Sequence, residues 1–168
     1  GSTHEIGPSD PLFTATVGGL GLTGVIEWVE FCAAPIPSSM LDAEDTEFEH
    51  VSDYFEIAAE KKSQFEHTMA WIDCLAGGAS LGRGVLSSAN WCDHGDLKPH
   101  REDPKLKVPV DAPDFGLNQL SMRAFNSIFH DLKTMKAGPY RCHYESFLYP
   151  LDAIANWNRL YGAKGFYQ

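Results

Sequence analysis

The sequence contains no apolar run that approaches the roughly 20 residues needed to span a bilayer, and no basic stretch followed by an apolar one opens it. Basic residues are scarce: 13 Lys and Arg stand against 23 Asp and Glu, which gives a formal net charge of −10. Because so acidic a surface repels phosphate, we expect neither nucleic acid nor an anionic membrane as a partner. No Gly-x-Ser-x-Gly element occurs, so a serine hydrolase has no support.

Cysteine is also rare, and the four residues are spread along the chain: Cys32, Cys74, Cys92 and Cys142. They are too few and too far apart for a disulfide framework, and no Cys-x-x-Cys occurs, so we expect reduced, mostly buried thiols in a cytoplasmic protein. Cys92, His94 and His100 are metal-ligand types, with Asp93 and Asp96 nearby. Their spacing matches no zinc pattern and lacks a second half-site, so we expect no metal.

The composition that remains is that of a globular domain, with 43% apolar and 12% aromatic residues in 168. Apolar periodicity, caps and turn residues predict helices at about 12–17, 47–62, 119–133 and 153–160, and strands at 25–32, 65–75, 81–91 and 140–149. The stretch 93–114 holds four prolines and mixed charge, which indicates a long loop. Helices mixed with hairpin-like strand pairs predict an α+β fold with a mainly antiparallel sheet flanked by helices.

Two helix starts carry the clearest local signals. Thr46-x-x-Glu49 is a capping box, and its helix would bear Phe48, Val51 and Phe55 on one face. Asn118 is a capping residue for the third helix. That helix carries an apolar series formed by Leu120, Ala124, Phe125, Ile128 and Leu132.

Gly19-x-Gly21-x-x-Gly24 matches the dinucleotide-binding fingerprint letter for letter. That fingerprint needs a strand before the glycines and a helix after them, because the helix N-terminus holds the pyrophosphate. Here the predicted order is reversed. A glycine-rich helix stop and turn explains the pattern more simply.

The wider context of the glycines resembles known proteins. Residues 12–26 are similar to the segment that closes the flavin-binding domain in FAD-linked oxidases of the vanillyl-alcohol oxidase superfamily. Further motifs resemble, in order and approximate spacing, the decaprenylphosphoryl-β-D-ribose oxidase group: Ala70-Trp71-Ile72-Asp73, Leu81-Gly82-Arg83-Gly84, Tyr149-Pro150-Leu151-Asp152, Asn156-Trp157-Asn158-Arg159-Leu160-Tyr161-Gly162 and Gly165-Phe166-Tyr167-Gln168.

The resemblance implies a division of the chain and a function. Residues 1–8 would be a tag remnant and flexible N-terminus, 9–34 the terminal segment of a flavin-binding domain, and 35–168 a partial substrate domain. In that family, FAD takes a hydride as a sugar hydroxyl becomes a keto group. The FAD-side positions would be Gly18, Gly19, Gly21, Thr23, Gly24, Val25 and Ile26. The substrate-side candidates would be Trp71, Leu148, Asn158, Arg159 and Gln168.

The departures from the family qualify this interpretation. The N-terminal flavin-binding half and everything after Gln168 are missing here, so we expect the isolated chain to be inactive and to bind FAD weakly or not at all. Leu148 stands where the polyprenyl-sugar enzyme has tyrosine, which leaves the substrate open as a sugar or another alcohol. Trp71 has the plainer alternative of a core residue, and Arg159 that of an ion pair with Asp152.

Two function classes therefore stay open. One is a fragment of an FAD-dependent oxidoreductase, and the other is a non-catalytic binding or oligomerisation module derived from such an oxidase. A strand beginning at Gly165–Gln168 would present an unpaired edge, and such an edge recruits another strand. We therefore expect a homodimer through that edge.

Overall fold

A computed structural model describes the chain except for residues 101–102, 112, 114–115, 117, 136–137 and 162–168. The chain divides into two compact units, Gly1–Pro35 and Ile36–Gln168. The predicted edge strand at Gly165–Gln168 lies outside the described residues, and so does the dimer contact assigned to it. None of the described helices is long and apolar enough to cross a membrane.

The first unit holds one helix, α1 (Pro11–Thr16), as the sequence predicts. Asp10 caps it by accepting a hydrogen bond from the Leu12 amide at 2.8 Å. The strand predicted at 25–32 is wrong: residues 25–36 carry no regular secondary structure, and Val25 is 94% exposed. Strand propensity mostly reflects packing on a half-buried sheet, and within this unit residues 25–32 have no strand beside them.

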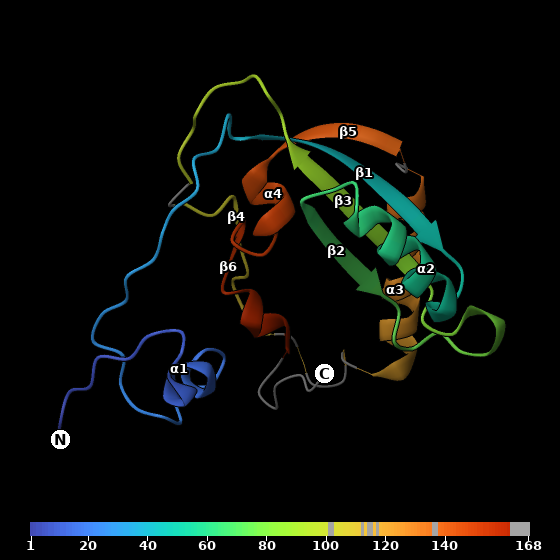
Figure 1. Cartoon of the computed structure of the whole chain (residues 1–168). Coiled ribbons are helices and arrows are strands. Elements are labelled where there is room, and N and C mark those ends of the chain that lie inside the picture. The colour runs from blue at the N-terminus through green and yellow to red at the C-terminus, as the bar shows by residue number, and fades with distance from the viewer. Residues whose placement is uncertain (101–102, 112, 114–115, 117, 136–137, 162–168) are drawn as a thin grey trace. The chain divides into compact units, whose positions relative to one another are not determined.

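The second unit is built on a four-stranded sheet with the order β2-β3-β1-β5 (Figure 1). Its strands are β1 (Met40–Phe48), β2 (His67–Ile72), β3 (Gly84–Trp91) and β5 (Gly138–His143). Every neighbouring pair is antiparallel. Two short strands, β4 (Leu106–Lys107) and β6 (Ile154–Ala155), pair in parallel apart from this sheet.

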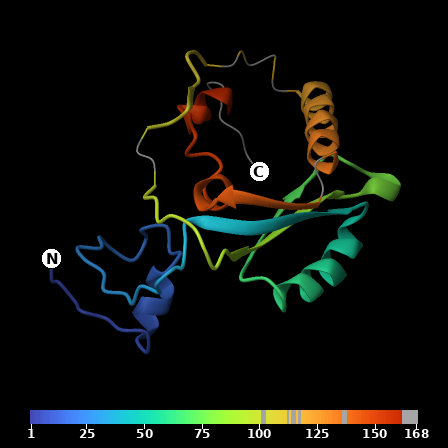
Figure 2. The ribbon, with the colours of Figure 1, turned by 90° about the horizontal axis from the view of Figure 1, so that it is seen from above.

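The two longer helices lie on opposite faces of the sheet (Figure 2). They are α2 (Val51–Lys62) and α3 (Gln119–Thr134). The shorter helical segments are α4 (Tyr144–Leu148) and the 3₁₀ turns η1 (Gly78–Ser80) and η3 (Trp157–Tyr161). These elements confirm the predicted α+β class, the β2–β3 hairpin and the third helix, whose Asn118 accepts hydrogen bonds from two backbone amides.

The capping box predicted at Thr46 and Glu49 is wrong. Thr46 and Phe48 lie in β1, paired with Leu86 and Gly84 of β3. The helix begins later, because His50 takes the capping position and its backbone N–H donates to the Asp53 carboxylate at 3.2 Å. Burial of Phe48, which is 2% exposed, outweighs the local capping preference.

The C-terminal predictions need a similar correction. The strand predicted at 140–149 ends at His143, because the His143 ring caps α4 by accepting a hydrogen bond from the Glu145 amide at 3.4 Å. The helix predicted from Asp152 is replaced by β6 and the 3₁₀ turn η3. Short segments such as these follow their tertiary contacts more than their own propensity.

The buried core lies on one face of the sheet. It consists of Leu41 and Ala43 of β1, Ala89 of β3 and Phe147 of α4, with Leu148 packed against it. On the opposite face, Phe48 packs against α2, where its ring lies 5.5 Å from that of Tyr54. The face that holds the core also carries the candidate site.

Candidate functional site

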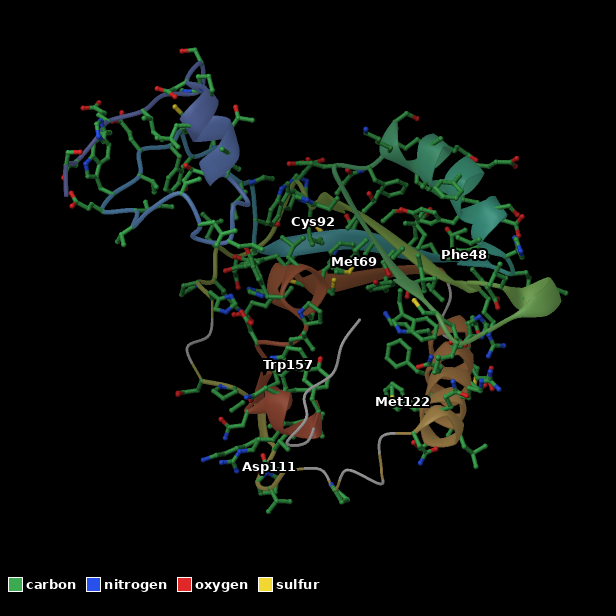
Figure 3. All side chains as sticks on the ribbon, turned by 90° about the horizontal axis from the view of Figure 1, so that it is seen from below. Phe48, Met69, Cys92, Asp111, Met122 and Trp157 are labelled. Carbon is green, nitrogen blue, oxygen red and sulfur yellow. The ribbon has the colours of Figure 1, made fainter. Side chains whose placement is uncertain are left out.

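Trp71, the first substrate-side candidate, lies on β2 on the same sheet face as the core. Its register partner is Val85, which in turn pairs with Glu47 of β1. Because side chains directly opposite in an antiparallel ladder share a face, these residues and the core point to the same side. Figure 3 views the sheet from its edge, with Met69 labelled on the sheet and Met122 on α3, which lies on this side of it.

The surroundings of Trp71 are aromatic and include a buried imidazole. Its ring lies 4.9 Å from the Phe129 ring and 6.3 Å from the His130 ring, centroid to centroid, and both partners belong to α3. His130 is 5% exposed, with Nε2 3.2 Å from the Glu47 carboxylate. Trp71 itself is half-buried, so part of its ring packs in the domain and part stays accessible to solvent.

Two motifs that carried the family resemblance meet at one place in the structure. Asp73, which ends the first motif, is 3% exposed, and its backbone N–H donates to the Arg83 carbonyl of the second motif at 2.8 Å. Its carboxylate accepts hydrogen bonds from Asn126 of α3 at 2.7 Å and from the Leu75 amide at 3.1 Å. Arg83 lies 3.5 Å from the same carboxylate and donates to Ser127 of α3 at 3.1 Å. These motif residues therefore join the hairpin to α3.

The glycines of the second motif serve the same junction. Gly82 has φ +63°, in the left-handed region that favours glycine. At Gly84, a Cβ would overlap the Trp71 carbonyl oxygen and lie 2.6 Å from the Phe48 ring. The close approach of β2 and Phe48 to β3 at Gly84 therefore requires glycine at this position.

The other substrate-side candidates lie on different elements. Leu148 ends α4 and packs against the core. Asn158 and Arg159 lie on η3 and are exposed; Arg159 donates to the Pro109 carbonyl at 2.7 Å and lies 3.7 Å from the Asp111 carboxylate. The anticipated partner Asp152 instead lies 3.3 Å from His100. Gln168 is outside the described residues.

The predicted FAD-side segment lies in the first unit and follows α1. Gly18, Gly21 and Gly24 have φ of +72°, +74° and +152°, and a Cβ added to any of them would meet nothing within 4 Å. Thr16 and Thr23 join the two ends of the turn through their hydroxyls at 3.0 Å. The segment thus presents an open backbone beside exposed apolar side chains and does not enclose a ligand within its own unit.

A cavity of about 340 Å³ at the end of β5 escaped the sequence reasoning. His100 is one of its lining residues, with Nδ1 3.5 Å from Glu145 and Nε2 3.3 Å from Asp152. Lys105 and Arg141 also line it, so both signs of charge are present. The sequence placed His100 in a long polar loop and among residues of metal-ligand type, but it did not indicate that Glu145 and Asp152 would lie beside it.

Arg141 also forms a bidentate ion pair with Asp42, on the face of the sheet opposite the core cluster. Its Nε and Nη2 donate to the two oxygens of Asp42 at 2.8 and 3.1 Å. These hydrogen bonds hold the pKa of Asp42 below its usual range. On the core face, Asp45 accepts from Ser87 at 2.6 Å and from Tyr140 at 3.1 Å, and burial together with that carboxylate raises the pKa of the Tyr140 phenol.

The cysteines correct one expectation. They are free thiols, but Cys32 and Cys74 are exposed, and of the four only Cys92 is fully buried. Burial raises the pKa of the Cys92 and Cys142 thiols. Among the described residues, no three His, Cys, Asp or Glu side chains are grouped so as to hold a metal ion.

Comparison with known proteins supports the resemblance inferred from the motifs. No protein-family model matches the chain. The chain is 28% identical to decaprenylphosphoryl-beta-D-ribose oxidase of Mycolicibacterium smegmatis over 170 residues, which cover 96% of this chain and 37% of the oxidase. It is 29% identical over 152 residues to an uncharacterized protein in the mprA 5′ region of Streptomyces coelicolor, covering 84% of this chain and 41% of that protein.

The chain therefore spans about two fifths of the length of the curated relatives it matches. The resemblance to the decaprenylphosphoryl-ribose oxidase group is confirmed over nearly the whole chain. Since that relative is an oxidase, the similarity indicates an oxidoreductase origin.

Proposed function

We propose that this chain is part of an FAD-dependent oxidoreductase that oxidises a sugar or alcohol hydroxyl to a keto group in the cytoplasm. The observation that carries the proposal is the similarity to an oxidase along 96% of the chain. The matched length of 37% of that oxidase supports the interpretation as a fragment, formed by the end of a flavin domain and part of a substrate domain. The isolated chain would then lack most of the flavin site and be inactive.

The FAD contacts proposed for this chain come from the glycine segment. Gly18, Gly21 and Gly24 allow close approach of the backbone to a flat ring system, because a Cβ is absent and nothing else fills that space. Val25 and Ile26 would supply apolar contact, since they are 94% and 60% exposed. FAD, when bound, supplies the hydride acceptor for the oxidation.

The substrate contacts proposed for this chain come from the second unit. Trp71, held by Phe129, presents a rigid aromatic surface on which a sugar ring can pack. Asn158 and Arg159 present exposed hydrogen-bond donors suited to hydroxyl or phosphate oxygens. Leu148 would add apolar surface, and Gln168 would contribute a side-chain amide. Together, these substrate-side residues would orient the substrate for hydride transfer to the flavin.

The first experiment is thermal unfolding of the chain with and without excess FAD, after recording the visible spectrum of the untreated sample. At about 100 times the dissociation constant, FAD would stabilise the fold by roughly 2.7 kcal/mol, which corresponds to about 5–10 °C for a chain of this size. Val25→Asp should abolish the shift, because it places a carboxylate in the proposed apolar contact. Leu97→Asp, at an apolar position that is 67% exposed in the other unit, is the control and should leave the shift unchanged.

The alternative is a non-catalytic binding or oligomerisation module of the same descent. The observation that favours it is the wide apolar surface left exposed on α3, where Leu120 is 80% exposed. A colourless, folded chain whose unfolding temperature is unchanged at millimolar FAD would reject FAD binding by the fragment, and self-association of that same chain would then support the module.

A further inference from the structure

The chain after β3 is held at one buried serine beside β1. Ser39 is 2% exposed; its hydroxyl accepts a hydrogen bond from the Lys98 amide at 2.6 Å and donates to the Lys98 carbonyl at 2.8 Å. The Ser39 amide donates to the Asp96 carbonyl at 3.0 Å, and its carbonyl accepts from the Tyr144 amide, the first of α4, at 3.0 Å. Segment 93–100 and the start of α4 therefore meet at Ser39.

His100 ends this segment between two carboxylates. Its Nδ1 lies 3.5 Å from Glu145 of α4, and its Nε2 lies 3.3 Å from Asp152. A neutral imidazole carries one N–H, so one of its nitrogens would turn a lone pair toward a carboxylate oxygen, whereas the charged ring has an N–H on both sides. The two carboxylates are therefore complementary to the charged form of His100.

A second histidine shares one of these carboxylates but has a different role. The Nδ1 of His143 lies 3.4 Å from the Glu145 carboxylate and accepts a hydrogen bond from the Glu145 amide at 3.4 Å, so this nitrogen carries no proton here. Further polar or aromatic residues around His100 are Asp103, Lys105, Arg141, Tyr144 and Tyr149. Of the side-chain types described around His100, histidine is the one whose charge ordinarily changes between about pH 5 and 8. His100 is the histidine that has a carboxylate at each nitrogen.

We propose that His100, Glu145 and Asp152 form a pH-sensitive clasp that fastens segment 93–100 to α4 beside the cavity of about 340 Å³. When His100 is charged, both carboxylates attract it. When the pH rises and the proton leaves, one of these attractions becomes a contact between a lone pair and a carboxylate. The clasp therefore stabilises the closed segment at low pH and loosens as the pH rises. It does not involve flavin, so it is tested separately from the proposed oxidoreductase function.

The test is hydrogen exchange of the Lys98 amide, followed by NMR on the whole 168-residue chain without FAD from about pH 5.5 to 8. This amide reports opening of the segment, because its hydrogen bond to the buried Ser39 hydroxyl must break before it exchanges. Dividing each rate by that of an unstructured peptide at the same pH removes the pH dependence of the exchange reaction itself. We expect the protection of Lys98 to fall about fivefold as the pH rises, since two partly exposed ion pairs are weakened.

His100→Gln keeps a neutral side chain at every pH. The protection of Lys98 should then be lower at low pH and should no longer change with pH, while the circular dichroism stays unchanged because the His100 side chain is 39% exposed. His94→Gln is the matched control, because His94 is an exposed histidine of the same segment. It should keep the fivefold response.

Asp152→Asn gives a second arm that retains His100. It leaves Glu145 as the carboxylate described beside that ring, so the response should shrink to about twofold. A purely structural His100 would change the protection by the same factor at every pH, which makes the pH dependence the decisive readout. Protection that does not vary with pH in the unmodified chain, a response that survives His100→Gln, or one that is lost in His94→Gln would each overturn the proposal.

Discussion

The junction at Asp73 yields the sharpest stability prediction. Asp73→Ala removes the acceptor for Asn126 and the Leu75 amide and leaves Arg83 without its carboxylate. Hydrogen bonds to a charged group contribute about 1.5–3 kcal/mol each, but Arg83 is partly exposed and can recover water. We therefore expect a loss of about 3 kcal/mol from an unfolding free energy of roughly 5–15 kcal/mol. Asp73→Asn keeps an acceptor oxygen and should lose only about 1 kcal/mol.

The assay is urea unfolding followed by circular dichroism and tryptophan fluorescence. A constant slope with a lower midpoint would show that stability changed and the unfolded state did not. Asp96→Ala is the matched control, because the Asp96 carboxylate is 81% exposed and its surface pair with Lys98 contributes about 0–1 kcal/mol. If Asp73→Ala lay within 0.5 kcal/mol of the unmodified chain, the junction would not hold α3 as described.

Three further predictions concern single sites. Iodoacetamide should label the exposed Cys74 at least tenfold faster than Cys92, because burial shields Cys92 and raises its pKa; equal rates by mass spectrometry would contradict the burial. Arg141→Met should raise the pKa of Asp42 in an NMR titration, because the hydrogen bonds that lower this pKa are removed; an unchanged titration would disprove the pairing. In the unmodified chain the lowered pKa of Asp42 stabilises the fold above the unfolded-state pKa, and that stabilisation is lost as pH falls through the folded-state pKa. Gly84→Ala should lose about 1–3 kcal/mol by overpacking, and a stability equal to that of the unmodified chain would refute the close strand contact.

Local signals predicted several elements correctly because their causes are local. Asn118 satisfies the first amides of α3, and Asp10 does the same for α1. The strands predicted at 65–75 and 81–91 pair as the hairpin β2–β3, and the short segment between them holds η1. These outcomes depend on hydrogen bonds between residues close in sequence, so the sequence alone carries the information.

The errors arose where distant partners outweighed local preference. Thr46 became part of β1 because the strands on both sides of β1 pair with it and Phe48 is buried between β3 and α2. The chain after Tyr144 turned helical because Phe147 packs into the core of the sheet. Helix and strand propensities differ by less than the free energy of burying one aromatic side chain, so packing decided these segments.

The candidate site divides in the same way. By themselves, the motifs around Trp71 and Arg83 determined the relationship to an oxidase, and periodicity determined that α3 is amphipathic. Periodicity states which residues share a face, but it does not state which face packs inward. Only the tertiary structure decided that Asn126 and His130 turn toward the sheet and the apolar side of the helix turns outward. The buried Asp73 carboxylate requires hydrogen-bond donors, one of which Asn126 supplies, and the buried His130 ring lies against Glu47.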